Sequence, residues 1–281
     1  MFQSIELKQG IHLHIRKTDQ FKTVNFSLKF KQILSEKSAA QRSVLANVLL
    51  HSNKQYPSNP AFRSALDELY GTSMYMDSSK KGNEHIITFM AESVNDQYLS
   101  SNGVLNQVID LFKTVLFNPN ADHHEFKDNI VKREKDSVIQ RIESLYDDKT
   151  RYAQHRLIEL LRPNHPASIG ANGTIEEVES VTPKSLWEAY QQMLHEDELD
   201  IYIVGDVDMD EMTEKMKTLF PLEGRTLANK QEMEFNDELN SNSSHVKEVQ
   251  NMKQGKLHIG FETPITFTHP KFPIMQITNG I

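Results

Sequence analysis

The sequence predicts an α+β fold in which an antiparallel or mixed sheet is packed by helices. Stretches with a period of two are interspersed with stretches at helical spacing, without the strict strand–helix–strand order of a parallel sheet. The 281 residues are 38% hydrophobic and 25% charged, which is an ordinary balance for a globular chain of one domain or one and a half. Proline or glycine stands where several patterned stretches end.

The first 116 residues alternate between strands and helices. Ile11, Leu13 and Ile15 fall on one face of a strand, and His12 and His14 fall on the other. In order, we expect strands at 5–15 with a break at residue 10 and at 24–30, helices at 39–51 and 61–70, strands at 74–76 and 86–90, and an amphipathic helix at 104–116.

The rest of the chain is mainly helical up to a change of composition. We expect helices at 126–146, 151–161 and 184–194, a buried strand at 199–204 and a helix at 209–220. Residues 221–254 are rich in Asn, Ser, Glu and Lys and are interpreted as a linker. A strand at 255–261 and a helix from Phe272 follow. These two elements cannot bury a core alone, so we expect 255–281 to begin a second domain that is cut short.

Composition excludes several functions. The net charge of −8, with Lys and Arg scattered among acids, argues against nucleic-acid binding. The absence of cysteine excludes disulfides and thiolate zinc sites. No apolar run reaches the ~18–20 residues of a membrane span. No signal peptide is evident at the N-terminus, so we expect a cytoplasmic protein.

Short segments along nearly the whole chain resemble those of one family in order and spacing. The segments are Tyr56-Pro57, Leu66-Asp67-Glu68-Leu69-Tyr70-Gly71-Thr72, Arg133-Glu134, Tyr146-Asp147-Asp148, His165-Pro166, Ile169-Gly170, Thr174-Ile175-Glu176, 199–208, 255–261 and His269-Pro270. Together they resemble the M16 metallopeptidases, the pitrilysin or inverzincin type. The resemblance implies an M16-type N-terminal domain at 1–220 and, at 255–281, the start of a second homologous domain. Its nearest likeness is to the inactive M16-like subunits of Gram-positive bacteria.

The family's catalytic residues are replaced at every matching position. M16 enzymes carry His-x-x-Glu-His on the first long helix, where two imidazoles four residues apart bind zinc and the glutamate is the base. Here the stretch reads Ser-Val-Leu-Ala-Asn, with Ser43, Ala46 and Asn47 at the working positions. The resemblance places the family's supporting glutamate at Glu134 and its third ligand, seven residues later, at Arg141. Arginine stays protonated in proteins and repels a metal, so we expect no metal and no cofactor here.

Three functions remain open from the sequence. The resemblance favours a non-catalytic subunit that pairs with an active zinc-bearing M16 homologue and contributes to peptide binding. The alternatives are a zinc peptidase with displaced ligands and a stand-alone peptide-binding scaffold. His12 and His14 could bind a metal, and Asp122-His123-His124-Glu125 is the densest acid–imidazole cluster, but an exposed polar face or loop explains each better. Neither a nucleotide-binding glycine pattern nor a serine-hydrolase motif occurs.

Overall fold

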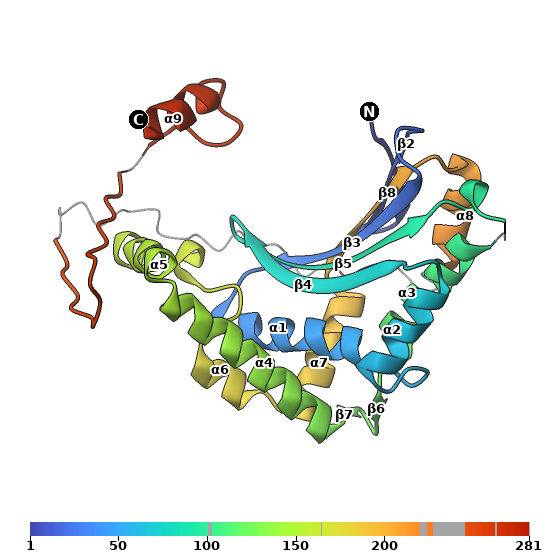
Figure 1. The fold of residues 1–281 in the computed structure, drawn as a ribbon, viewed down its shortest axis with the longest axis horizontal. Coiled ribbons are helices and arrows are strands. Elements are labelled where there is room, and N and C mark those ends of the chain that lie inside the picture. Colours follow the sequence, from blue (N-terminus) through green and yellow to red (C-terminus); the bar gives the residue numbers. More distant parts are fainter. Residues whose placement is uncertain (101–102, 164, 220–223, 227–244, 262, 281) are drawn as a thin grey trace.

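The fold is a six-stranded mixed sheet with helices gathered on one face (Figure 1). A computed structural model describes residues 1–100, 103–163, 165–219, 224–226, 245–261 and 263–280. The strand order is β1-β2-β8-β3-β5-β4. The strands are β1 (Gln3–Lys8), β2 (Ile11–Lys17), β3 (Thr23–Ile33), β4 (Ser73–Lys81), β5 (Glu84–Val94) and β8 (Glu198–Gly205). This architecture confirms the α+β prediction.

One strand pair makes the sheet mixed. β8 runs parallel to β2 and antiparallel to β3, so it lies between two strands from the N-terminal end of the chain. The remaining pairs are antiparallel. The sequence predicted β8 as a buried strand, but no local pattern indicates that it is inserted between β2 and β3. That position depends on contacts across more than 180 residues, such as His14 with Asp200.

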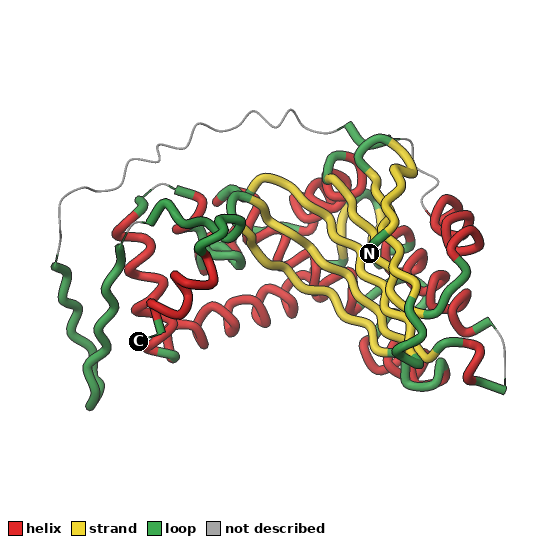
Figure 2. The backbone as a smooth tube through the Cα atoms, turned by 90° about the horizontal axis from the view of Figure 1, so that it is seen from above, coloured by secondary structure: helices red, strands yellow, loops and turns green. Residues whose placement is uncertain are grey.

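Helices cover one face of the sheet and leave the other, concave face open (Figures 1 and 2). The described helices are α1 (Glu36–His51), α2 (Asn59–Glu68), α3 (Val104–Phe117), α4 (Asp128–Asp147), α5 (Lys149–Leu161), α6 (Ile175–Ser180), α7 (Pro183–His195), α8 (Met209–Leu219) and α9 (Phe272–Asn279). Helix α9 buries no residue and lies apart from this layer, on the side of the concave face (Figure 1). Helix α1 lies against α4, α6, α7 and β4, which places it at the centre of the helical layer.

The core lies between the sheet and this helical layer. Alternate residues of β2, β3, β5 and β8 point into it and are fully buried, and Phe112 of α3 packs against Phe89 and Phe26 with ring centroids 4.6 and 6.0 Å apart. Its buried apolar residues run from Ile11 to Leu219. The predicted periodicities therefore identified the buried faces, because burial of those faces stabilises the elements.

Several local features differ from the expectation. The long helix begins at Asp128 rather than 126, because Phe126 pairs with Ala121 in a small hairpin, β6 (Ala121–Asp122) and β7 (Glu125–Phe126). The short helix α6 begins with a capping box formed by Thr174 and Glu177. Two 3-10 turns, Asp96–Tyr98 and Pro166–Ser168, complete the connections.

The predicted strand at 255–261 is wrong for this chain. The segment is irregular, and Leu257 and Phe261 are 78% and 87% exposed. A strand needs a neighbour to take its backbone hydrogen bonds, and no described residue pairs with this segment. Gly260 instead lies close to Leu157 and Leu161 of α5. Helix α9 begins at Phe272 as predicted. Residue 220 and most of the predicted linker, residues 221–223 and 227–244, lie outside the described residues.

Candidate functional site

Ser43 lies at the buried middle of α1 and hydrogen-bonds to two other segments. It is fully buried, and its hydroxyl lies 2.6 Å from Ser78 Oγ of β4. The same hydroxyl donates to Asn172 Oδ1 at 2.8 Å. Ala46, one turn further along α1, is part of the apolar core. The first of the predicted positions is therefore a helix–strand–loop junction held by neutral hydrogen bonds.

Asn47 and Arg141 are brought together across α1 and α4. Arg141 Nη2 donates to Asn47 Oδ1 at 3.3 Å, and Arg141 Nη1 lies 3.7 Å from Asp77 Oδ1 of β4. Asn47 is buried, and its Nδ2 has no hydrogen-bond partner among the described residues. The structure thus places the residues of two distant sequence segments, 94 positions apart, in one contact.

Glu134 lies nearly fully buried on α4 and bonds a histidine and an arginine. His51 Nδ1 lies 3.0 Å from Glu134 Oε2, and Arg133 reaches Oε1 at 2.8 Å. Burial by itself would raise the pKa of the Glu134 carboxyl. The hydrogen bonds and charges of His51 and Arg133 outweigh burial and lower that pKa below its ordinary value. Glu134 is therefore a carboxylate that ties α4 to the end of α1.

A loop after α5 closes over the first half of α1. Lys80 Nζ of β4 donates to the carbonyls of Ala167 and Ile169, and Ser43 bonds Asn172. Gly173 has a φ of +70°, and a Cβ placed there would lie 2.9 Å from the backbone nitrogen of Ala40. Only glycine permits this approach and this backbone conformation without strain.

Sequence reasoning missed a buried charged group beside this site. Arg42 Nη1 bonds Asp197 Oδ2 at 2.7 Å, and both side chains are almost fully buried. Arg225 packs over the ring of Phe30 and donates to the carbonyl of Met193. Arg225 belongs to the predicted linker, and nothing in its local composition indicates burial. His51 follows Asn47 by four residues in the sequence, but its pairing with Glu134 depends on how the two helices cross.

The other imidazole-rich segment forms an exposed turn. His123 and His124 join β6 to β7 with φ values of 52° and 63°, and the His124 ring stacks on Trp187 with centroids 5.6 Å apart. No group of three metal-binding side chains includes this turn or the Ser43–Arg141 region within the described residues; the one such group is His12, Glu198 and Asp200.

The chemistry available around Ser43 and Asn47 is hydrogen bonding, together with the ion pair between Arg141 and Asp77. A catalytic zinc needs three donors such as imidazole or carboxylate together with an open position. A hydroxyl, an amide and a guanidinium do not form that set, so the residues present do not fit a zinc ion. The arrangement joins α1, α4 and β4 without a metal.

Comparison with known proteins shows the family of this chain. A curated relative from Bacillus subtilis (strain 168), described as "Probable inactive metalloprotease YmfF", is 37% identical over 273 residues, covering 97% of this chain and 64% of the relative. The family model for the peptidase M16 inactive domain matches residues 180–281. The chain belongs to the M16 peptidase family. It spans 64% of the length of this M16 relative, and both matches agree with the expectation of an inactive-type chain.

Solved M16-type structures share the fold. A conserved protein from Enterococcus faecalis V583 superposes with a TM-score of 0.76 at 31% identity, covering 80% of this chain and 53% of that one. The periplasmic protease PqqL from Escherichia coli superposes with a TM-score of 0.66 at 17% identity, covering 82% of this chain and 25% of that one. The second likeness shows the fold alone. Among the described residues, no helix has the length and apolar character needed to cross a bilayer.

Proposed function

We propose that this chain belongs to a non-catalytic M16 subunit that pairs with a zinc-bearing M16 homologue and contributes to binding its peptide. The observation that carries the proposal is the contact between Asn47 and Arg141, in which Arg141 Nη2 lies 3.3 Å from Asn47 Oδ1. In our interpretation these residues, with Ser43, Ala46 and Glu134, occupy the positions of a lost zinc site.

The charge at this place supports the loss of metal binding. Arg141 carries a permanent positive charge that repels a divalent cation. Its hydrogen bond to Asn47 also takes up the side-chain oxygen through which an amide would bind a metal. A zinc ion would link α1 to α4, and we infer that the pairs Asn47–Arg141 and His51–Glu134 make that link here.

The retained core supports a role as a folded subunit. The apolar residues from Ile11 to Leu219 form one buried cluster, so the loss of catalytic residues is not accompanied by loss of the scaffold. We propose that residues 1–220 are the N-terminal M16 domain, 221–254 a linker and 255–281 the beginning of a second domain. The exposed Leu257, Ile259 and Phe261 are then side chains that the rest of that domain would cover. A cysteine-free chain suits the reducing cytoplasm, where we place it.

Co-purification tests the pairing. The full-length protein is tagged in its native cell and purified without crosslinking, and bound proteins are identified by mass spectrometry. We expect a homologue that carries His-x-x-Glu-His in a stoichiometric complex. Mixing the two purified proteins should yield a heterodimer on size-exclusion chromatography with multi-angle light scattering.

Other outcomes correspond to the alternatives. Peptide cleavage by the purified chain alone that a chelator abolishes would indicate a zinc peptidase with displaced ligands. Peptide binding without a zinc-bearing homologue, and without complex formation on mixing, would indicate a stand-alone scaffold. Either result would contradict the pairing.

A further inference from the structure

A second cluster of metal-binding side chains lies on the open face of the sheet. In β2, the residues Ile11, Leu13 and Ile15 point into the core, so His12 and His14 point the other way. In β8, Glu198 and Asp200 alternate in the same way with buried Leu199 and Ile201. The parallel register sets His12 beside Asp200. Helices α1 and α4, which carry Ser43 and Arg141, lie on the opposite face of the sheet, so this cluster is separate from the Ser43–Arg141 region (Figure 1).

The distances within the cluster suit one small cation. His12 Nδ1 lies 3.7 Å from Asp200 Oδ1 and 3.9 Å from Glu198 Oε1, and one ligand atom from each of the three residues lies within 4.8 Å of the others. Ligands at about 2.0–2.2 Å from a tetrahedral zinc are separated by roughly 3.3–3.6 Å. Small side-chain rotations would therefore close the three ligands around an ion, and water would take the fourth position.

His14 supports the cluster from its edge. Its Nδ1 pairs with the Ser4 hydroxyl at 2.8 Å, and its ring stacks on Tyr202 with centroids 4.6 Å apart. These contacts direct Nε2 toward Asp200 Oδ1, which lies 3.2 Å away. A hydrogen bond to a ligating carboxylate is a common feature of metal sites and fixes the carboxylate's orientation.

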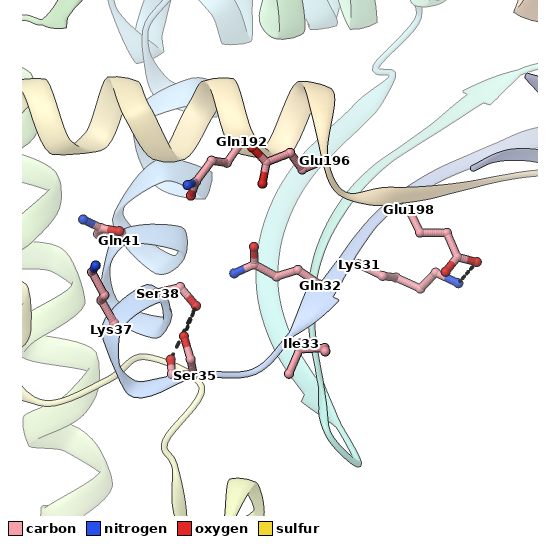
Figure 3. A pocket seen from close by; sticks show the side chains of 10 residues that line it. All are labelled: Lys31, Gln32, Ile33, Ser35, Lys37, Ser38, Gln41, Gln192, Glu196 and Glu198. Atoms are coloured by element: carbon pink, nitrogen blue, oxygen red, sulfur yellow. Dashed lines mark hydrogen bonds and ion pairs between the residues drawn. The ribbon is translucent and has the colours of Figure 1, made fainter. Parts of the chain in front are cut away.

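A cation already occupies the position between the carboxylates. Lys31 Nζ of β3 lies 2.7 Å from Asp200 Oδ2 and 3.0 Å from Glu198 Oε1. Lys31 and Glu198 also line a hollow of about 320 Å³, and the ion pair is drawn at its edge in Figure 3. Neither His12 nor Asp200 lines this hollow. An ion would reach the cluster from the open face of the sheet, where the His12 side chain is 35% exposed.

We propose that His12, Glu198 and Asp200 form a site for a divalent transition metal of the zinc class, in which the metal replaces the Lys31 ammonium. His14 is the positioning residue. An ion bound there would join β2 to β8, two strands that lie side by side although they are distant in sequence. The bound metal would hold the β1–β2 hairpin to the rest of the sheet.

Zinc titration of the purified full-length protein tests the site, with binding measured by isothermal calorimetry and melting temperature by calorimetry. We expect one zinc per chain and a rise in melting temperature as zinc is added. His12→Ala should abolish both effects. His14→Gln should weaken binding about 10–100-fold, the usual cost of losing a supporting hydrogen bond.

The Lys31→Met substitution should change zinc affinity in the opposite direction. Removing the competing ammonium should tighten zinc binding, so this variant keeps the test decisive even where His12→Ala fails to fold. One control separates this site from others: the exposed pair His123→Ala/His124→Ala should bind zinc as the unmodified chain does. Failure of both the unmodified chain and Lys31→Met to bind zinc would overturn the proposal. So would binding that His12→Ala leaves unchanged.

Discussion

His85 shows how one buried side chain shapes the stability of this protein. It lies fully buried on β5, close to Arg42 of α1. Burial and then the charge of Arg42 lower its pKa to about 3, and the Ala171 backbone offsets this only in part. Neither ring nitrogen makes a well-formed hydrogen bond to a described residue. The imidazole is therefore neutral in the folded protein throughout the physiological range.

Acid should destabilise the protein through His85. The unfolded chain binds a proton below about pH 6.5, whereas the folded chain stays neutral down to about pH 3. The unfolded state thus binds more protons in this window, and stability falls as pH falls through it. By pH 4.5, two units below the ordinary value, His85 should remove roughly 2.7 kcal/mol of unfolding free energy.

Urea unfolding of His85→Leu between pH 7.5 and 4.5 measures this effect. Leucine removes the titrating group and two buried ring nitrogens that make no well-formed hydrogen bond, so the variant should match or exceed the original stability at pH 7 and lose less at pH 4.5. His123→Leu, at an exposed turn, is the control and should keep the original pH dependence. An unchanged acid slope in His85→Leu would exclude His85 as the source.

At the scale of elements, the sequence predicted the helices and strands that are determined by their own hydrophobic periodicity. The apolar spacing of α3 and the alternation in β2 and β3 each match a buried face, whereas α1 is buried on every side over 42–49. Where pairing partners decide, local reasoning failed: residues 255–261 alternate as a strand but have no described neighbour to pair with. The loop at 167–172 gave no local sign of its hydrogen bonds, because those bonds go to Lys80 of β4 and Ser43 of α1.

The loop at Gly173 can be tested against a matched glycine. Gly173 and Gly71 have nearly the same φ, +70° and +71°, but a methyl group added at Gly173 would meet neighbouring atoms, whereas one added at Gly71 would face open space. Gly71→Ala should cost about 1–2 kcal/mol for the left-handed backbone alone. Gly173→Ala should cost more, because the methyl group also pushes the loop away from Ala40.

Chemical denaturation of the two variants gives the comparison. Hydrogen exchange should also show faster opening of residues 170–173 in Gly173→Ala only. Equal destabilisation of both variants would mean that the close approach of this loop to α1 contributes nothing.

For the whole molecule, the candidate site was predictable in part. The positions Ser43, Ala46, Asn47, Glu134 and Arg141 came from order and spacing along the chain, and the structure brings Asn47 and Arg141 into contact. Their correspondence to a zinc site stays a proposal. The contacts of Ser43 with Ser78 and of Glu134 with His51 depend on helix crossing and strand position, which no single segment encodes.

The two predictions about metal binding concern different places in the molecule and have opposite outcomes. The helical face of the sheet should hold no ion beside Asn47, and the open face should hold one at His12, Glu198 and Asp200. A bulk zinc assay would count both places together. A measurement that locates the ion is therefore needed.

Anomalous scattering at the zinc absorption edge, from crystals equilibrated with zinc, tests the central claim directly. We predict no anomalous peak between Ser43, Asn47 and Arg141, whatever the occupancy of the open face. A peak coordinated by those residues, or by His51 and Glu134 beside them, would contradict the account of a lost catalytic site.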